Sequence, residues 1–307
     1  MKTLTVFTPT FNRAYCLGRL YESLKRQTSS DFEWLVIDDG SSDDTETLVR
    51  EWLSEGSISI RYISQENQGM HGAHNTAYAH ISTELNVCID SDDYMPDQAV
   101  EIIVNFWKEY GTNEVSGFVA LDAYTDGTLI GSLLPDQIER SSLFALYNTH
   151  GVTGDKKLVY RSELTRQFPY PLFHEERYVG LAYKYYKLDE MLPLLLLNEV
   201  LCYVEYMEDG SSRNMLKQYV RNPKGFAFYR KALMESPLPS RFFKYRQAVH
   251  YISSCLFARN KRWISDSPKK WLTLLAIPPG LLLHMYIRRK VKDKNVPRGR
   301  TNDYSVG

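Results

Sequence analysis

Two acidic clusters, each closing a short apolar run, constrain the fold of this chain more than any other feature. Residues 32–37 (FEWLVI) lead into the cluster 38–41 (DDGS), and residues 85–89 (LNVCI) lead into the cluster 90–93 (DSDD). Both runs have the length and composition of β-strands. If the two strands are parallel neighbours in an open sheet, both clusters emerge at its carboxyl edge, where such sheets bind ligands.

Carboxylates gathered at one edge repel one another unless a cation sits among them. Ligands that are all oxygen suit Mg²⁺ or Mn²⁺, and such an ion suits a substrate that carries a diphosphate. For either cluster alone, the competing interpretation is an ordinary turn followed by a helix cap.

The first 110 residues alternate between strand and helix patterns, which predicts an α/β fold with a mostly parallel sheet flanked by helices. The expected strands are 4–8, 32–37, 58–63 and 85–89, and the expected helices are 14–27, 44–54, 73–81 and one that begins at Pro96.

The regular alternation of strand and helix patterns ends at about residue 115. The later expected strands are 115–121, 128–134, 157–160 and a long strand or hairpin over 192–206; the expected helices are 141–147, 162–167, 175–187, 219–234 and 241–257. We therefore predict one α/β domain over 1–212, with halves 1–110 and 111–212, then a helical region over 213–294 and a disordered tail over 295–307.

The amino-acid composition is that of a folded protein and gives no sign of several kinds of partner or metal site. The 307 residues are 43% hydrophobic and 24% charged, as in ordinary folded proteins, and the formal net charge of zero gives no reason to expect nucleic acid as a partner. The four cysteines form no CxxC pair, so neither a zinc site nor a disulfide framework is expected, and a cytoplasmic protein is the default. The chain begins directly with a strand pattern, without the features of a signal peptide.

Four motifs in order resemble the family 2 glycosyltransferases, whose bacterial members build surface polysaccharides. They are 8–13 (TPTFNR), 37–45 (IDDGSSDDT), 67–75 (NQGMHGAHN) and 90–93 (DSDD). The resemblance implies the GT-A fold, a Rossmann-like α/β architecture, and a nucleotide-sugar donor. The family's inverting members hold Mn²⁺ or Mg²⁺ against the donor diphosphate.

The resemblance also assigns residues to the nucleotide. Thr8, Pro9 and Arg13 stand where the family's first loop lines it. Asp39, with Asp38 alongside, is expected to accept hydrogen bonds from the uracil or ribose.

A second group is expected at the diphosphate. Asp90 and Asp92 match the family's DxD motif, in which one carboxylate contacts ribose and the other holds the metal, and Asp93 is an additional expected metal ligand. The same resemblance places Asn75 at the donor, and places Arg213 in a segment that commonly closes over the diphosphate. The alternative for that segment is a solvent-exposed loop.

Inversion requires a base that takes the proton of the acceptor hydroxyl. The family places an acidic residue at the start of a helix beyond the DxD motif, so Glu175 or Glu176 is the predicted base; the alternative is that these acids complement a helix dipole. Family members often have arginine where this chain has His74, which leaves the charge at that point open. His71 and His74 lack the further ligands of a zinc site.

Residues 271–287 are the most apolar stretch of the chain, with lysines before them and Arg288, Arg289 and Lys290 after them. The prolines Pro278 and Pro279 are expected to break a helix here. We predict an amphipathic segment over 267–292 that lies on the inner face of the cell membrane. The alternative is burial against the catalytic domain or in a homodimer.

The sequence thus predicts a metal-dependent, inverting glycosyltransferase of the hexose-transferring kind. Its donor would be a nucleotide sugar, with a UDP-sugar favoured, and its acceptor a glycan or a polyprenyl-linked saccharide. A nucleotidyltransferase is disfavoured because the loop 8–13 contains no glycine. The alternative from another class is a non-catalytic sugar- or partner-binding protein with the same fold.

Overall fold

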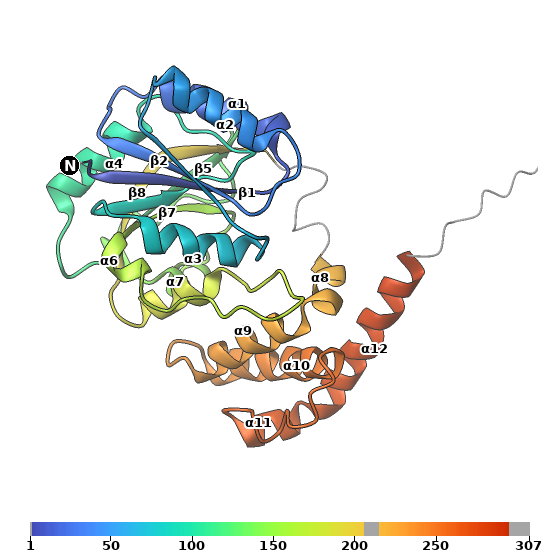
Figure 1. Cartoon of the computed structure of the whole chain (residues 1–307). Coiled ribbons are helices and arrows are strands. Elements are labelled where there is room, and N and C mark those ends of the chain that lie inside the picture. Colours follow the sequence, from blue (N-terminus) through green and yellow to red (C-terminus); the bar gives the residue numbers. More distant parts are fainter. Residues whose placement is uncertain (1, 206–214, 295–307) are drawn as a thin grey trace, which may run out of the picture. The chain divides into compact units, whose positions relative to one another are not determined.

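The computed structural model describes residues 2–205 and 215–294, which belong to two compact units (Figure 1). The first unit comprises residues 1–209 and 236–238, and the second comprises residues 210–235 and 239–307.

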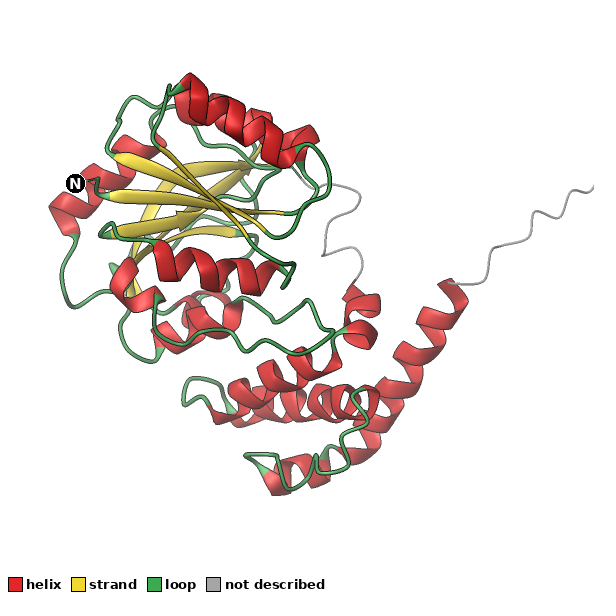
Figure 2. Cartoon of the chain, in the orientation of Figure 1, coloured by secondary structure: helices red, strands yellow, loops and turns green. Residues whose placement is uncertain are grey.

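Eight strands of the first unit form one sheet (Figure 2). They are β1 (Leu4–Thr10), β2 (Phe32–Asp38), β3 (Ile60–Ser64), β4 (Leu85–Cys88), β5 (Gly117–Tyr124), β6 (Arg140–Ser141), β7 (Lys156–Arg161) and β8 (Leu194–Val204). Their spatial order is β3-β2-β1-β4-β7-β5-β8-β6. The pairs β1–β2, β1–β4 and β2–β3 are parallel, whereas β7 is antiparallel to both of its neighbours. This confirms the α/β prediction, with the parallel part confined to the strands of the first 90 residues and to β5–β8.

Helices cover both faces of this sheet. They are α1 (Ala14–Lys25), α2 (Thr45–Glu55), α3 (Met70–His80), α4 (Ala99–Tyr110), α5 (Leu143–Asn148), α6 (Ser162–Thr165) and α7 (Ala182–Asp189). The apolar sides of α1, α2 and α4 share one core with β1, β2 and β4. α3, α6 and α7 lie on the opposite side of the sheet in Figure 1. Because both faces are covered, β1 is buried along its whole length, its three threonines included.

The sheet order corrects one detail of the predicted edge. β2 and β4 are not neighbours; each pairs with β1, which lies between them. The two acidic clusters therefore stand on either side of the loop that follows β1.

Several predicted elements differ from the structure. Residues 128–134 form no regular strand and contribute a single bridge between Leu129 and Ala123. The helix expected over 175–187 begins at Ala182, and residues 192–206 contain one strand, β8, rather than a hairpin. The helix expected over 219–234 is divided between two helices of the second unit.

Helices of the second unit pack around a long central one. They are α8 (Met215–Arg221), α9 (Pro223–Glu235), α10 (Arg241–Phe257), α11 (Lys270–Leu275) and α12 (Ile277–Lys294). α10 contacts α9, α11 and α12, and its buried residues include Tyr251, Ile252 and Cys255. A Cβ at Gly280 of α12 would lie 2.8 Å from the Ile252 side chain, so glycine permits the close crossing of these two helices.

The two prolines do not break the tail helix where the sequence suggested. The helix break falls at Ala276, and Pro278 and Pro279 lie in the first turn of α12. Amide groups in a first turn have no partner within the helix, so proline is tolerated there. Within residues 2–205 and 215–294, no helix has both the length and the apolar character needed to cross a bilayer.

Candidate active site

The carboxylates that end β2 are both buried and hydrogen-bonded. Asp38 accepts hydrogen bonds from the Ser41 amide at 2.8 Å and from the Tyr62 hydroxyl at 2.6 Å. Its oxygens therefore brace the turn after β2 and the strand β3.

Asp39 binds the segment 65–69, which leads into α3. It accepts hydrogen bonds from the Gln65 side chain at 2.7 Å, from the Gln68 amide at 2.8 Å and from the Gly69 amide at 2.7 Å. Burial raises the pKa of Asp39, and these three donors oppose that rise. A carboxylate has about four acceptor positions, so one remains for a ligand. The role of Gln65 was not predicted from the sequence.

The loop after β1 joins the two acidic clusters. Asn12 adopts a positive φ of 53°, and its side chain accepts a hydrogen bond from the Ser42 amide at 2.7 Å. On the other side, a guanidinium nitrogen of Arg13 lies 3.8 Å from a carboxylate oxygen of Asp92. Arg13 therefore lies beside the second cluster, while its neighbour Asn12 contacts the first.

Thr8 and Pro9 lie deeper than a lining role suggests. Both are buried, and the Thr8 hydroxyl accepts a hydrogen bond from the indole of Trp34 at 3.0 Å. Trp34 is itself packed against Trp52 and Tyr21. Thr8 therefore supports the floor of the site from within the core.

The three aspartates after β4 have different surroundings. Asp90 is exposed and Asp92 is partly buried, whereas Asp93 is 5% exposed and accepts a hydrogen bond from the Glu205 amide at 3.2 Å. Burial raises the pKa of Asp93 to about 8 against the opposing charge of Lys157. The Asp93 side chain therefore connects this loop to the end of β8.

A lysine whose side chain is only 12% exposed lies beneath the cluster and was missed from the sequence. Lys157 of β7 approaches Asp122 of β5 with a nitrogen–oxygen distance of 3.7 Å. Burial lowers the pKa of Lys157, but Asp122, Asp93 and Asp90 outweigh burial and hold it well above the usual value. The lysine is therefore a fixed positive charge below the acidic loop. Only the strand order brings β7 beside β4, so no local pattern marks it.

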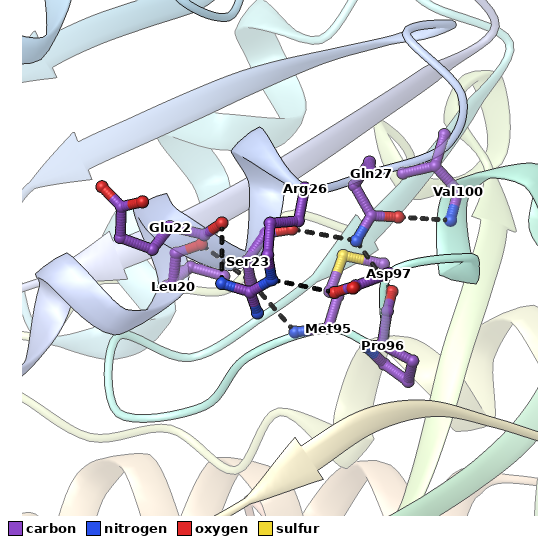
Figure 3. A network of polar contacts seen from close by, with 9 residues as sticks. All are labelled: Leu20, Glu22, Ser23, Arg26, Gln27, Met95, Pro96, Asp97 and Val100. Atoms are coloured by element: carbon purple, nitrogen blue, oxygen red, sulfur yellow. Dashed lines mark hydrogen bonds and ion pairs between the residues drawn. The ribbon is translucent and has the colours of Figure 1, made fainter.

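Helix α1 and the two residues after it bind the segment 95–100, which follows the acidic cluster (Figure 3). The Gln27 side chain donates to the Pro96 carbonyl at 2.7 Å and accepts from the Val100 amide at 2.9 Å, and the Ser23 hydroxyl accepts from the Met95 amide at 3.2 Å. One turn earlier, Arg19 donates to the Asp92 carbonyl at 2.6 Å. These contacts fix the backbone of the loop against a rigid helix.

Asn75 contacts a segment that is distant in the sequence. Its amide donates to the Tyr170 carbonyl at 2.8 Å, and its side-chain oxygen accepts from the Tyr170 amide at 2.9 Å. Asn75 therefore fastens a distant segment onto α3.

The neighbouring histidines are buried and neutral. Burial lowers the pKa of His71 and of His74 to about 4. At His74, where the family often has arginine, this chain accordingly presents an uncharged ring near neutral pH.

The two candidate bases, Glu175 and Glu176, differ in their exposure to solvent. Glu175 has a positive φ of 66° and a side chain that is 83% exposed, whereas Glu176 is 6% exposed. Neither opens a helix, because α7 begins at Ala182; this corrects the expected helical setting. Arg213, the remaining predicted site residue, lies outside the described residues.

Asp90 and Asp92 are the residues that would hold a divalent cation, if its other ligands came from a substrate and water. Among the described residues, no group of three or more His, Cys, Asp and Glu side chains is arranged to hold a metal ion. Magnesium and manganese sites of this kind commonly use one or two carboxylates and take further ligands from substrate phosphates and water. The partly exposed Asp92, beside Asp90, supplies such carboxylates.

The family model described as "Glycosyl transferase family 2" matches residues 5–164, just over half of the chain. The chain belongs to this family. The matched residues of this family 2 member include both acidic clusters, α3 and β7.

The chain is also similar to individual glycosyltransferases in sequence and in fold. The chain is 34% identical over 106 residues to a GalNAc(5)-diNAcBac-PP-undecaprenol beta-1,3-glucosyltransferase of Campylobacter jejuni, and the match covers 34% of each chain. It shares its fold with S. aureus TarS 1-349 in complex with UDP-GlcNAc (TM-score 0.61, 17% identity, 95% and 89% of the chains covered). It also shares its fold with a Pyrobaculum calidifontis mannosyltransferase in complex with GDP-Man and Mn²⁺ (TM-score 0.54, 16% identity, 94% and 83% covered). The matches to the curated relatives span about a third of their length or less.

Proposed function

We propose that this chain is a metal-dependent, inverting glycosyltransferase. It takes a sugar from a nucleotide-sugar donor, with a UDP-sugar favoured, and transfers it to a glycan or polyprenyl-linked saccharide in cell-surface polysaccharide synthesis. The observation that carries the proposal is the placement of Asp39 and Asp92 on opposite sides of the β1 loop, with Arg13 between them. The donor and acceptor named for the structural and sequence relatives support the same substrate class.

Each residue has a role that follows from its surroundings. Asp39 accepts a hydrogen bond from the nucleoside at its remaining acceptor position, and Arg13 faces the diphosphate. Asp92, with Asp90 beside it, holds Mn²⁺ or Mg²⁺; when bound, the ion neutralises the negative charge that develops on the leaving diphosphate. Asp93 is assigned to support of this loop, because its carboxylate is buried against the Glu205 amide.

Glu176 is the proposed base. It takes the proton of the acceptor hydroxyl while the acceptor oxygen bonds to the anomeric carbon and the bond from that carbon to phosphate breaks. Glu176 is chosen over its neighbour because its side chain is largely shielded from water. The neighbouring Glu175 is open to solvent.

A donor screen tests the function. Purified protein is incubated with UDP-, GDP- and dTDP-sugars and Mn²⁺, and released nucleoside diphosphate is measured. We expect release from a UDP-sugar, at least a tenfold loss of rate with EDTA, and recovery with Mn²⁺ or Mg²⁺. If no nucleotide sugar is turned over but a saccharide binds, the alternative of a non-catalytic binding protein replaces this proposal.

The second unit suggests where the reaction takes place. The inner face of α12 packs on α10, whereas Leu281, Leu282, Met285 and Tyr286 remain exposed on its other face. Trp271 of α11 is 82% exposed. We propose that this apolar face lies on the anionic inner surface of the cell membrane, because exposed lysines and arginines flank it at 269–270 and 288–290.

Flotation with vesicles tests the membrane proposal. Replacing Leu282 with aspartate is expected to reduce binding to phosphatidylglycerol-containing vesicles at least tenfold, because it places a charge in the apolar face. Phe242→Asp is the control, since Phe242 is 72% exposed on α10. Equal loss in both variants would contradict the assignment of this face. Self-association that only Leu282→Asp abolishes, without lipid binding, would show that a second copy covers it.

A further inference from the structure

Arg19 of α1 connects the turn 90–93 to the end of β8. One terminal nitrogen of its guanidinium donates to the Asp92 carbonyl at 2.6 Å, and the other donates to the Glu205 carboxylate. The same guanidinium lies over the Tyr94 ring, 5.3 Å from the ring centroid. A guanidinium presents its donors in a fixed plane, so it can hold two acceptors at a set separation. Arg19 therefore fixes the backbone of Asp92 relative to Glu205.

Other contacts join the same two segments one residue further along. The amides and carbonyls of Tyr94 and Tyr203 exchange two hydrogen bonds, at 3.1 and 2.8 Å, and the Glu205 amide donates to the Asp93 carboxylate at 3.2 Å. The Tyr94 and Tyr203 rings lie with their centroids 5.2 Å apart. These bonds hold the residues that follow Asp92, whereas Arg19 holds the peptide group of Asp92 itself.

The orientation of this peptide group bears on the proposed metal ligands. The Asp93 amide donates to the Asp90 carbonyl at 3.0 Å, so residues 90–93 form a tight turn with Asp92 inside it. A rotation of the Asp92 peptide within the turn would redirect its carboxylate. Mg²⁺ requires near-ideal octahedral geometry, and loss of the outer contacts that orient metal ligands typically costs about 10- to 100-fold in metal affinity.

We propose that Arg19 is a positioning residue that sets how tightly the Asp92 carboxylate binds the divalent ion that accompanies the donor diphosphate. It acts through the Asp92 backbone. This inference rests on the proposed function, because it assumes that Asp92 holds such an ion. The Arg19 and Glu205 side chains are 39% and 46% exposed, and ion pairs of this kind contribute little to stability, so loss of Arg19 should leave the fold intact.

The effect of Mn²⁺ on UDP binding tests the inference without any turnover. Calorimetry gives the dissociation constant of UDP with and without Mn²⁺, and their ratio measures the coupling between ion and nucleotide. We expect a ratio of about 50 in the wild-type protein and about 5 in Arg19→Gln, because glutamine cannot hold both acceptors. The dissociation constant of UDP without Mn²⁺ should change less than about twofold, since Asp39 and its hydrogen-bond donors are left in place.

Two further variants separate positioning from charge and from general effects on this part of the fold. Arg19→Lys keeps the positive charge but lacks the planar pair of donors, so the ratio should still fall at least about threefold. Arg26→Gln is the matched control. Arg26 follows the same helix and binds Asp97 at 3.1 Å, so its replacement should leave the ratio within about twofold of the wild type.

The outcomes that contradict the inference are distinct from those that contradict the proposed function. A wild-type ratio in Arg19→Gln, with or without a lower melting temperature, overturns the positioning role and leaves the proposed function standing. If Arg19→Gln does not fold, a wild-type ratio in Arg19→Lys has the same meaning. Wild-type protein whose UDP binding does not respond to Mn²⁺, or that binds no UDP, overturns the metal-dependent proposal and the inference together.

Discussion

Replacing Asp92 with asparagine is expected to lower the rate of sugar transfer by about a thousandfold or more while leaving the fold intact. The carboxylate is partly exposed and faces Arg13, so its loss opens no cavity in the core. It is the proposed anchor of the divalent ion, and stabilisation of leaving-group charge by a metal is worth several kcal/mol. Release of UDP from the active donor with Mn²⁺ measures the effect, and thermal unfolding checks the fold.

Asp97→Asn is the matched control for Asp92. It lies on the same segment and forms a surface ion pair with Arg26 at 3.1 Å (Figure 3). Such exposed pairs contribute little, so activity within about twofold of the wild type is expected. Full activity of Asp92→Asn would exclude the metal-binding role.

Glu176→Gln is expected to lower the rate of sugar transfer about a hundred- to ten-thousandfold. Glutamine keeps the shape of the side chain but cannot take the proton of the acceptor hydroxyl. The dissociation constant of UDP, measured by calorimetry with Mn²⁺, should change less than threefold. A variant with lost transfer and intact nucleotide binding would place Glu176 in the chemical step.

The neighbouring Glu175→Gln serves as the comparison. Its side chain is exposed, so we expect at most a threefold effect on transfer. The reverse result, a large loss at Glu175 and little at Glu176, would exchange the two assignments.

The parallel half of the fold follows from local patterns in the sequence. The runs that form β1, β2 and β4 carry apolar residues on both faces, which is typical of strands covered by helices on each side. The acidic clusters at their ends could therefore be predicted to share an edge. That β1 separates them was not visible, because strand order depends on contacts between distant segments.

The secondary structure after about residue 115 was predicted less well from the sequence. The expected strand 128–134 contains Gly131 at a φ of 74°, where a Cβ would lie 2.0 Å from the Thr153 carbonyl oxygen. The expected helix from Glu175 is replaced by a loop that Asn75 and Gly69 hold in place. Helical periodicity depends on neighbours one turn away. Asn75 and Gly69, in contrast, lie about a hundred positions before the loop that they contact.

The position of β7 also has a consequence for synthesis of the chain on the ribosome. All four strands β1 to β4 have been made once residue 88 has emerged, but the outer edge of β4 is paired only by β7, at residues 156–161. Until then, the nascent chain carries an unpaired strand edge directly below its acidic loop, and such edges readily pair with other chains. Synthesis of β7 is thus the step that covers this edge.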